Sequence, residues 1–514
     1  MPEKKLKVLV VGGAGYVGSA TCAHLVSQGY RVWVLDDLST GHRSFVLGEG
    51  FVHARAGDRD RVRELLRRER FDCVMHFAAR ALVAESVEKP DEYLENNVEQ
   101  TRALLEVMLE EDHHTFIFSS SCAVFGNAEV PRIDESQPRK PLNPYGESKR
   151  RAEEILTRLA ANGLQSVALR YFNAAGADLR HPVGEWHHVE THLIPRILNA
   201  ARNGAPVEIY GTDYPTPDGT CIRDYIHVSD LAEAHEAAML RLLRSAKGGR
   251  FEAFNLGSAN GYSVREVIAA CEKEVGKKLV VEEKPRRPGD PPRLVADSSL
   301  AARELGFKPR LGLAEIIHSA GEWEKKRAQF RRKAIFLDRD GTLNEDPGYL
   351  SDPNQLKVLP KVRHALASLK GAGYLLVVVS NQSGVGRGLI KEGVLEIIHD
   401  RLNGMLRPAS ALIDHFELCF HRPEENCECR KPKPKLIHDA AAKLGIDVSR
   451  SYIIGDKASD IGAGRAAGCR GVALVRTGYG ATVEKEIKPG DCDFIGDSLL
   501  DVAAWILDSE NAGS

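Results

Sequence analysis

The chain has 514 residues, of which 70 are Lys or Arg and 72 are Asp or Glu. A single hydrophobic core rarely serves more than about 250–300 residues, so this length predicts at least two domains. The balanced charge offers no general attraction to nucleic acid or to an anionic membrane. The apolar runs at 7–11 and 374–379 are too short for a signal peptide or a membrane span. The ten cysteines show no disulfide framework, which favours a reducing, cytoplasmic compartment.

Strand-like runs alternate with longer helical patterns through the first half of the chain. These runs lie at 7–11, 31–35, 73–77, 115–118 and 166–169. Such alternation predicts a parallel sheet with helices on both faces.

A glycine-rich loop follows the first of these strands. It reads Gly13-x-Gly15-x-x-Gly18 and leads into a helical stretch, the fingerprint of a dinucleotide site. Asp36 ends the next strand, 18 residues after Gly18. A carboxylate there accepts a bond from a ribose 2′-hydroxyl and repels a 2′-phosphate, so NAD is favoured over NADP. Ordinary turn residues are the alternative, and they fit the strand–loop–helix context less well.

A second group of residues predicts oxidoreductase chemistry. Ser121 follows a strand, Tyr145 stands 24 residues later, and Lys149 lies four beyond it. Tyr145 and Lys149 share one helix face, so the ammonium is expected to lower the pKa of the phenol towards neutrality. Ser121 can orient a substrate hydroxyl. A Tyr-x-x-x-Lys pair alone is usually an ordinary amphipathic helix, but in this order the motifs indicate a short-chain dehydrogenase/reductase.

Residues 6 to about 327 resemble the UDP-glucose 4-epimerase family along their whole length. The stretches that carry the resemblance are 12–18, 35–38, 76–79, 96–98, 118–121, 143–146, 169–173, 211–216, 218–220, 223–228, 255–257 and 285–290. The resemblance implies that Tyr145 takes the proton of the sugar 4-hydroxyl while a hydride passes to tightly bound NAD. The 4-keto sugar then rotates, and the hydride returns to its other face. The resemblance also implies a homodimer.

The resemblance assigns roles to particular residues. The catalytic residues it implies are Ser121, Tyr145 and Lys149. Those implied for NAD are Gly12, Gly15, Gly18, Asp36, Asp58, Asn97 and Tyr171. Those implied for the nucleotide sugar are Asn173, Arg223, Arg287, Asp290 and Leu294. Leu294 stands where the family often has a bulky Tyr, so we hypothesise that UDP-GlcNAc and UDP-GalNAc are also interconverted; the alternative is that Leu294 merely packs differently.

The stretch 322–333 is strongly basic and lacks Gly and Pro. A solvated helix end joining two domains explains it better than a nucleic-acid patch. We therefore place an epimerase domain at 1–328, with its NAD-binding core at about 1–175 and its substrate lobe at about 176–328. A phosphatase domain is expected at 329–514.

The second half opens with its own catalytic pattern. Asp338 and Asp340 follow an apolar, strand-like run, and their spacing of two points both side chains the same way. One carboxylate can therefore attack phosphorus while the other protonates the leaving oxygen. Ser380, Lys431 and Asp456 follow in the order expected of a phosphatase. A Mg²⁺ ion is expected on Asp338, the Asp340 carbonyl and Asp456, with Lys431 and Arg430 clamping the phosphate. An Asp-x-Asp pair alone would often be a turn or a calcium loop.

Four potential metal ligands lie close together in the sequence. They are Cys419, His421, Cys427 and Cys429. Three thiolates and one imidazole suit a closed, tetrahedral structural Zn²⁺ site, and buried free cysteines are the alternative. Because the cluster directly precedes Arg430, zinc is expected to fix the loop that carries the phosphate clamp.

Residues 334 to about 508 resemble D-glycero-D-manno-heptose 1,7-bisphosphate 7-phosphatase, of the haloacid dehalogenase superfamily. The stretches that carry this are 336–342, 347–349, 381–388, 419–429, 429–432 and 476–478. Histidinol phosphatase shares the cysteine motif and is the nearest rival. Arg387 favours the heptose substrate, since a second phosphate needs another guanidinium. The resemblance implies substrate roles for Asn381, Arg387 and Arg430.

The sequence thus predicts an α/β protein with two domains. The first is a Rossmann-type doubly wound parallel sheet with a small substrate lobe, and the second is a haloacid dehalogenase-type Rossmannoid domain with a zinc-bound loop. We expect a cytoplasmic bifunctional enzyme that uses NAD, Mg²⁺ and Zn²⁺ on UDP-sugars and heptose bisphosphate, with neither nucleic acid nor membrane as a partner. Three alternatives stay open: a UDP-GlcNAc or UDP-pentose epimerase joined to a histidinol-phosphate or other sugar-phosphate phosphatase, one active domain with a regulatory or binding partner domain, and a first domain acting on a heptose nucleotide.

Overall fold

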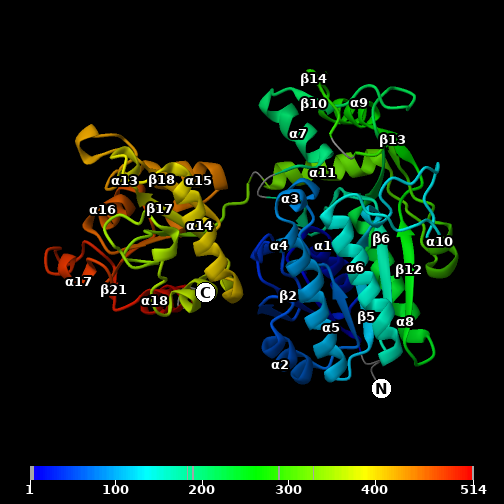
Figure 1. Cartoon of the computed structure of the whole chain (residues 1–514), viewed down its shortest axis with the longest axis horizontal. Helices are drawn as coiled ribbons and strands as arrows, with labels where there is room; N and C mark the ends of the chain where they lie inside the picture. Colours follow the sequence, from blue (N-terminus) through cyan, green and yellow to red (C-terminus); the bar gives the residue numbers. More distant parts are fainter. Residues whose placement is uncertain (1–4, 182, 188–189, 288–289, 328, 512–514) are drawn as a thin grey trace. The chain divides into compact units, whose positions relative to one another are not determined.

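The computed structural model describes residues 5–181, 183–187, 190–287, 290–327 and 329–511. The chain forms two compact units, Met1–Arg327 and Ala328–Ser514, called here the N-terminal and C-terminal units (Figure 1). Within the described ranges, no helix has both the length and the apolar content needed to cross a membrane.

A seven-stranded parallel sheet forms the centre of the N-terminal unit. Its order is β12-β6-β5-β4-β1-β2-β3. The strands are β1 (Lys7–Val11), β2 (Arg31–Asp36), β3 (Gly50–His53), β4 (Cys73–His76), β5 (Thr115–Ser121), β6 (Gln165–Tyr171) and β12 (Arg250–Leu256).

Helices cover both faces of this sheet, as the alternation of side chains along β1 shows. Leu9 and Val11 pack into a core with α2 (Arg59–Glu69), α5 (Gln100–Glu110) and α6 (Pro144–Leu159). Val8 and Val10 pack into the opposite core with α1 (Tyr16–Ser27) and α8 (Val228–Arg244). Successive strand residues point to opposite faces, so a continuous apolar strand requires cover on both sides.

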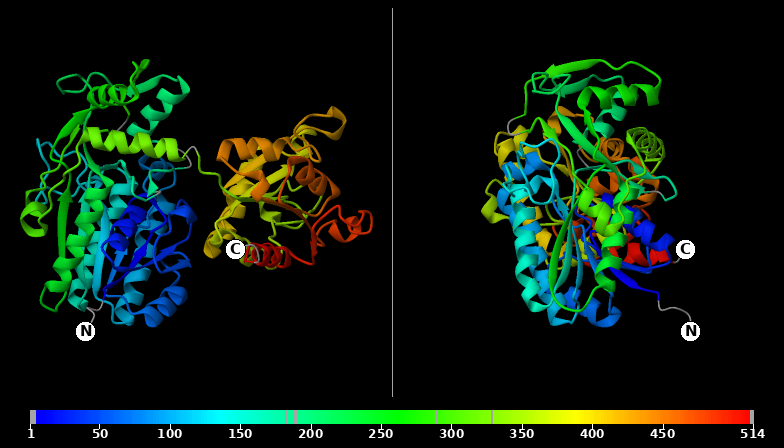
Figure 2. Two further views of the ribbon diagram at one scale, coloured as in Figure 1. Left: turned by 180° about the vertical axis from the view of Figure 1, so that it is seen from behind. Right: turned by 90° about the vertical axis from the view of Figure 1, so that its right-hand side faces the viewer.

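A smaller lobe completes the N-terminal unit and lies at one end of the sheet (Figures 1 and 2). Its strands are β7 (Asn173–Ala175), β8 (Ala177–Asp178), β9 (Val183–Gly184), β10 (Val207–Tyr210), β11 (Ile222–His227), β13 (Gly261–Ser263), β14 (Val281–Lys284) and β15 (Arg293–Leu294). The helices of the lobe core are α7 (Leu193–Asn203), α9 (Val264–Val275) and α11 (Leu313–Arg327). Shorter helices of the unit are α3 (Val83–Glu88), α4 (Pro90–Leu94) and α10 (Ser299–Leu305).

The C-terminal unit has its own six-stranded parallel sheet, in the order β18-β17-β16-β19-β20-β21. The strands are β16 (Ala334–Leu337), β17 (Leu375–Asn381), β18 (His415–Cys419), β19 (Tyr452–Gly455), β20 (Gly471–Val475) and β21 (Phe494–Gly496). One face packs on α12 (Val362–Gly371), α14 (Glu392–Leu406) and α18 (Leu499–Asn511). The other packs on α15 (Lys435–Leu444) and α16 (Ala458–Ala467). Two short helices, α13 (Ser383–Gly386) and α17 (Gly480–Val483), lie in loops after β17 and β20.

The predicted α/β class, with a doubly wound parallel sheet in each half and a small lobe in the first, is confirmed. Several strand boundaries differ by one to three residues; the strand expected at 115–118, for example, continues through the three serines to Ser121. The reason is that β5 keeps its pairing with β6 as far as Ser121 and Tyr171.

Candidate active sites

The loop between β1 and α1 has the close backbone contacts that its glycines permit. A Cβ on Gly12, whose φ is +83°, would lie 2.3 Å from the main-chain nitrogen of Ala78. A Cβ on Gly18 would lie 2.2 Å from the oxygen of Gly12. Gly15 is the N-cap of α1 and carries no side chain that could occupy the helix terminus. The α1 N-terminus can therefore receive a pyrophosphate, which fits a dinucleotide cofactor.

Asp36 lies at the end of β2, against this glycine loop. Its buried carboxylate accepts hydrogen bonds from the nitrogens of Ala14 (3.0 Å) and Leu38 (2.8 Å). Burial, aided by the charge of Asp37, raises the pKa of Asp36 to about 7. The carboxylate thus lies against the glycine loop, and its proton occupancy changes near neutral pH. Its expected bond to a ribose hydroxyl stays a prediction.

Two other residues predicted to bind NAD, Asn97 and Asp58, form hydrogen bonds with main-chain atoms. The Asn97 amide accepts from the nitrogen of Arg80 and donates to its oxygen, both at 2.9 Å. Asn97 also donates to the hydroxyl of Ser148, at 2.9 Å. Asp58 caps α2 by accepting from the nitrogen of Arg61.

The predicted catalytic residues come together at the carboxyl end of β5. Asn143 caps α6 by accepting from the nitrogen of Gly146, so the first turn of this helix presents Tyr145. Ser121 is the neighbour whose hydroxyl lowers the pKa of Tyr145 against the effect of burial. The ammonium of Lys149 donates to the main-chain oxygen of Ser119, at 2.8 Å, and lies 5.9 Å from the centre of the Tyr145 ring.

Tyr171 belongs to the same group. Its hydroxyl lies 2.5 Å from the hydroxyl of Ser119, the residue whose carbonyl receives Lys149. Because β6 pairs directly with β5, the register of the sheet brings Tyr171 next to the catalytic strand end.

The expectation that Lys149 lowers the pKa of Tyr145 is wrong for the protein alone. Burial raises the pKa of Tyr145 above its ordinary value, and the bond from Ser121 offsets this only in part. Burial also lowers the pKa of Lys149 to about 7, because a desolvated ammonium is less favoured. Proximity to Lys149 therefore does not by itself ionise the phenol.

The residues predicted to bind the nucleotide sugar lie in the lobe. The guanidinium of Arg223, in β11, pairs with the carboxylate of Asp290. Leu294, in β15, is the register partner of Arg223. Asn173 begins β7, which pairs with the far end of β11. The structure thus brings Arg223, Asp290 and Leu294 together.

Arg287 is placed differently. Its guanidinium stacks 4.0 Å from the centre of the Tyr210 ring, at the end of β10. Cys122 is a neighbour of the sugar residues that the sequence motifs did not reveal. Cys122 packs with Leu294 in one small hydrophobic core, and the charge of Arg223 acts on the pKa of its thiol. Its only sequence signal was its position directly after Ser121.

The carboxylate of Asp338, just beyond β16, is the centre of the second site. Its Oδ1 accepts from the hydroxyl of Ser380 (2.8 Å) and from the ammonium of Lys431 (3.0 Å). Lys431 also lies 2.6 Å from Asp460 and donates to the oxygen of Val379, at 2.7 Å. The order expected from the sequence therefore corresponds to a contiguous buried cluster.

The surroundings of the Asp456 carboxylate indicate whether a divalent cation fits this cluster. Oxygens of Asp338, Asp456 and Asp460 lie within 4.8 Å of one another. Oδ2 of Asp456 accepts from the nitrogen of Tyr479, while Oδ1 is buried without a hydrogen-bond partner among the described residues. Burial raises the pKa of Asp456 to about 7. An unpartnered buried carboxylate oxygen beside two more carboxylates fits a hard cation such as Mg²⁺.

Asp340 is surrounded by donors. The buried guanidinium of Arg339, together with Asn344 and Gln382, hydrogen-bonds its carboxylate. Burial opposes the charge, but Arg339, Asn344 and Gln382 together outweigh it and lower the pKa of Asp340. The ionised form is therefore favoured in the free protein, and the expected role of Asp340 as an acid stays a prediction.

Of the three residues predicted to bind the phosphorylated substrate, one supports Lys431 directly. The Asn381 amide accepts from the Lys431 nitrogen at 3.0 Å and donates to its oxygen at 3.2 Å. Arg430 donates to the carbonyl of His421, and Arg387 pairs with Glu424. The structure thus places Arg430 on the loop that holds His421, and Arg387, which follows α13, pairs with Glu424 of that loop.

Lys457 is a cation at this site that the sequence reasoning did not assign. Its ammonium lies 4.0 Å from Oδ2 of Asp338 and 3.2 Å from Oδ2 of Asp346. Its position directly after Asp456 was the available signal.

The cysteine motif forms a compact cluster. The sulfur atoms of Cys419, Cys427 and Cys429 lie 2.9–3.5 Å apart. Nδ1 of His421 lies 3.2 Å from the sulfur of Cys429. A disulfide needs about 2.05 Å, whereas thiolates of a tetrahedral Zn²⁺ site lie roughly 3.7 Å apart. The donors therefore fit a zinc ion better than a disulfide.

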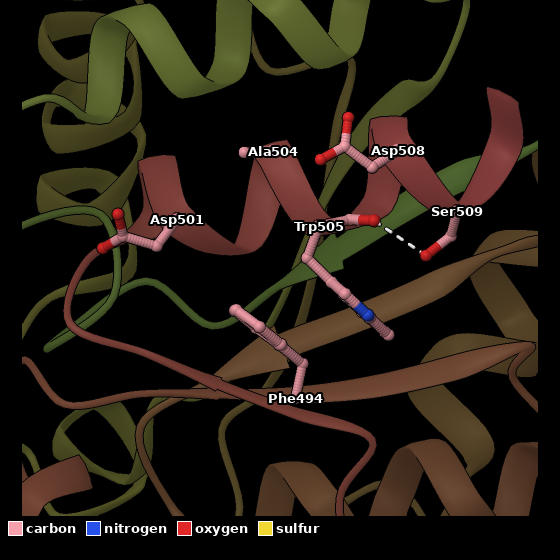
Figure 3. Close-up of a pocket in the computed structure, with 6 residues that line it drawn as sticks. All are labelled: Phe494, Asp501, Ala504, Trp505, Asp508 and Ser509. Carbon is pink, nitrogen blue, oxygen red and sulfur yellow. Dashed lines mark hydrogen bonds between the residues drawn. The ribbon is translucent and has the colours of Figure 1, made fainter. Parts of the chain in front are cut away.

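A hollow of about 540 Å³ lies elsewhere on the C-terminal unit, between β21 and α18 (Figure 3). It is lined by Phe494, Asp501, Ala504, Trp505, Asp508 and Ser509. None of these is a predicted site residue, so this hollow is separate from the chemistry described above.

Comparison with known proteins agrees with this geometry. The NAD dependent epimerase/dehydratase family matches residues 8–257, and a HAD-hydrolase-like family matches residues 428–502. The chain is 44% identical to UDP-glucose 4-epimerase of Rhizobium meliloti over 326 residues, which are 63% of this chain and 98% of that protein. The corresponding enzyme of Lactobacillus helveticus is 44% identical over 62% of this chain and 97% of its own length.

Solved structures show the same likeness for the N-terminal unit. UDP-glucose 4-epimerase from Brucella ovis in complex with NAD is 46% identical, with a TM-score of 0.60 over 62% of this chain and 98% of that one. The UDP-Glc/GlcNAc 4-epimerase of Campylobacter jejuni is 38% identical, with a TM-score of 0.55 over 62% and 99%. The chain therefore belongs to the NAD dependent epimerase/dehydratase family, and it carries a HAD-hydrolase-like segment in its C-terminal unit.

Proposed function

We propose that the N-terminal unit is an NAD-dependent UDP-glucose 4-epimerase. The observation that carries this proposal is the Ser121–Tyr145–Lys149 group at the carboxyl end of β5, with Asp36 and the glycine loop at the ends of β2 and β1 of the same sheet. Ligands of open α/β sheets bind at the carboxyl ends of the strands. The names of the relatives, and their near-complete coverage by this chain, support the same activity.

Each residue has a defined task in this proposal. Ser121 orients the sugar 4-hydroxyl, and Tyr145 takes and later returns its proton. Lys149, fixed on the Ser119 carbonyl, supplies a nearby cation without entering the proton path. Bound NAD would supply the hydride acceptor. Leu294, the register partner of Arg223, is smaller than the Tyr that the family often has there, so UDP-GlcNAc and UDP-GalNAc are included among the proposed substrates.

We propose that the C-terminal unit is a Mg²⁺-dependent phosphatase with Asp338 as its nucleophile. Ser380 and Lys431 both contact Oδ1 of Asp338, which restrains the carboxylate and provides a cation where a phosphate would be attacked. Asp338, the Asp340 carbonyl and Asp456 would hold the Mg²⁺, which would neutralise phosphate charge. The thiolate cluster would hold Zn²⁺.

The proposed substrate of this unit is D-glycero-D-manno-heptose 1,7-bisphosphate, with removal of the 7-phosphate. Arg430, which contacts His421, and Arg387, which pairs with Glu424 of the same loop, provide two guanidinium groups for a second phosphate. Histidinol phosphate is the competing substrate, and it lacks a second phosphate for these arginines to bind.

We place the functional boundary between the two enzymes at 328–329; residue 328 itself lies outside the described residues. A homodimer formed through the epimerase and a cytoplasmic location remain predictions.

Two single substitutions in the full-length chain test the proposal. Tyr145→Phe should abolish UDP-glucose/UDP-galactose interconversion and leave phosphate release unchanged. Asp338→Asn should do the reverse. Each variant is assayed on panels of UDP-sugars and sugar phosphates, with Tyr30→Phe and Asp352→Asn as matched controls. Loss of both activities from either change, or absence of one activity in the unmodified chain, would contradict two independent active sites.

A further inference from the structure

Two Glu-x-His pairs lie on the segment between β9 and α7. They are Glu185 with His187, and Glu190 with His192. One donor atom from each side chain lies within 4.8 Å of the other three. None of these side chains has a task in the proposed epimerase chemistry, and the group is remote in sequence from the thiolate cluster.

The geometry centres on the carboxylate of Glu185, which is only 5% exposed. Its Oε1 lies 2.7 Å from Nδ1 of His192 and 3.3 Å from Nε2 of His187. Both are ion-pair contacts, and Oε1 and His187 Nε2 are buried atoms without a hydrogen-bond partner among the described residues. A buried carboxylate is costly unless a cation compensates it. These atoms lie within 4.8 Å of the ligand atoms of Glu190 and His192.

The surrounding residues hold the donors in this arrangement. Trp323 donates its indole N–H to the main-chain oxygen of Glu185, at 2.8 Å. A Cβ on Gly184 would lie 2.6 Å from the Trp323 ring, so close packing fixes the backbone just before Glu185. His192 is the N-cap of α7, yet its ring does not cap the helix and lies against Glu185 instead. The Glu190 carboxylate is oriented by a hydrogen bond that it accepts from the main-chain nitrogen of His192, at 2.8 Å.

We propose that Glu185, His187, Glu190 and His192 bind a divalent transition-metal ion, with Zn²⁺ as the first candidate. Two imidazoles and two carboxylates are ligands that zinc accepts in tetrahedral sites. The His192 side chain is 47% exposed, which gives the ion a route from solvent. A metal here would tie the end of β9 to the start of α7 and neutralise Glu185.

The experiment uses the full-length chain, freed of metal by a chelator and reloaded with Zn²⁺ or Co²⁺. We expect about two zinc ions per chain, one here and one at the thiolate cluster. His192→Gln should reduce the content to about one while keeping the sulfur-to-cobalt charge-transfer absorption. Cys427→Ser should also reduce it to about one, but with loss of that absorption. His181→Gln, which removes a nearby imidazole that pairs with Asp178, is the matched control and should retain both ions.

A change at the buried Glu185 can prevent folding. Glu185→Gln is therefore studied together with His192→Gln, whose position is half-exposed, and circular dichroism confirms that each variant folds. Loss of a residue that only hydrogen-bonds a metal ligand typically lowers metal affinity about 10- to 100-fold. Loss of a direct ligand should therefore lower the affinity at least as much. Equal zinc content and affinity in the unmodified chain and in a folded His192→Gln would overturn the proposal. The four residues would then form only an imidazolium–carboxylate ion pair.

Discussion

The ammonium of Lys431 lies 3.0 Å from Oδ1 of Asp338, and both side chains are almost wholly buried. A buried charge pair of this kind contributes mainly through what its disruption costs, because either partner left alone is an uncompensated charge. At a phosphatase centre the same ammonium also meets the negative charge of the incoming phosphate.

We expect Lys431→Met to lower phosphate release by about 10²- to 10³-fold, because one preorganised cation is lost. The C-terminal unit should also lose stability, by about 3–5 kcal/mol, since Asp338 and Asp460 are left without their partner. Steady-state phosphate assays and urea unfolding measure the two effects. Lys433→Met, which removes a partly exposed lysine paired with Glu428, is the control and should change neither. A Lys431→Met enzyme with normal turnover would contradict the role assigned to the ammonium.

The affinity for NAD should weaken as the pH falls below 7. The pKa of Asp36 is raised from 3.8 to about 7 in the folded protein. Between these values the folded state holds a proton that the unfolded state releases, so this contribution to stability declines as the pH rises towards 7. A ribose hydroxyl donates to the ionised carboxylate, so binding must remove that proton below pH 7. We expect an affinity loss of about tenfold per pH unit from 7 to 5.

Titration calorimetry on the NAD-free protein measures this dependence. Asp36→Asn should bind more weakly and with a flat profile across the same range. A profile of the unmodified protein that is equally flat would show that Asp36 does not receive the ribose.

Gly478→Ala should abolish or greatly reduce phosphate release. A Cβ at Gly478 would lie 2.1 Å from Oδ2 of Asp456, the proposed metal ligand. Gly490→Ala provides the matched control, because this glycine also has a positive φ, yet no heavy atom lies within 4 Å of its added Cβ. Both changes carry the backbone strain of a left-handed residue. If the two variants had the same activity and the same Mg²⁺ requirement, the contact with Asp456 would not be the cause.

Removal of zinc from the thiolate cluster should lower phosphatase activity. Cys429 is separated from Lys431 by one residue, so the metal would anchor the loop that carries the ammonium. Treatment with a zinc chelator in excess Mg²⁺, or Cys427→Ser, should reduce phosphate release by about tenfold or more. Cys492→Ser, outside the cluster, should have no effect. A zinc-free enzyme with full activity would leave the cluster without a part in catalysis.

Leu294→Tyr should narrow the epimerase substrate range. Leu294 pairs in register with Arg223, and a bulky phenol there would fill space that an N-acetyl group needs. We expect kcat/KM for UDP-GalNAc to fall by at least about tenfold while UDP-galactose is little affected. Leu294→Met conserves volume and is the control. An unmodified enzyme without UDP-GalNAc turnover would already refute this hypothesis.

The sequence pattern was sufficient to predict the elements that depend only on residues close together in the chain. The apolar strand 7–11, its glycine loop and the Tyr145–Lys149 spacing all depend on neighbouring residues, and each element forms as expected. β15 was not predicted, because a two-residue strand exists only through its pairing with β11. The contact of Lys149 with the Ser119 carbonyl could not be predicted either, since it depends on how α6 packs on β5. The pKa of Tyr145 was misjudged because spacing gives no measure of burial.

Each hydrophobic core described above draws its residues from one unit only. Leu9 and Ile335 are buried in different cores, so heating can disrupt one while the other persists. The chain should therefore show two calorimetric transitions, and no single melting temperature describes it. NAD should shift one transition and Mg²⁺ the other, so calorimetry can report cofactor binding to each unit separately.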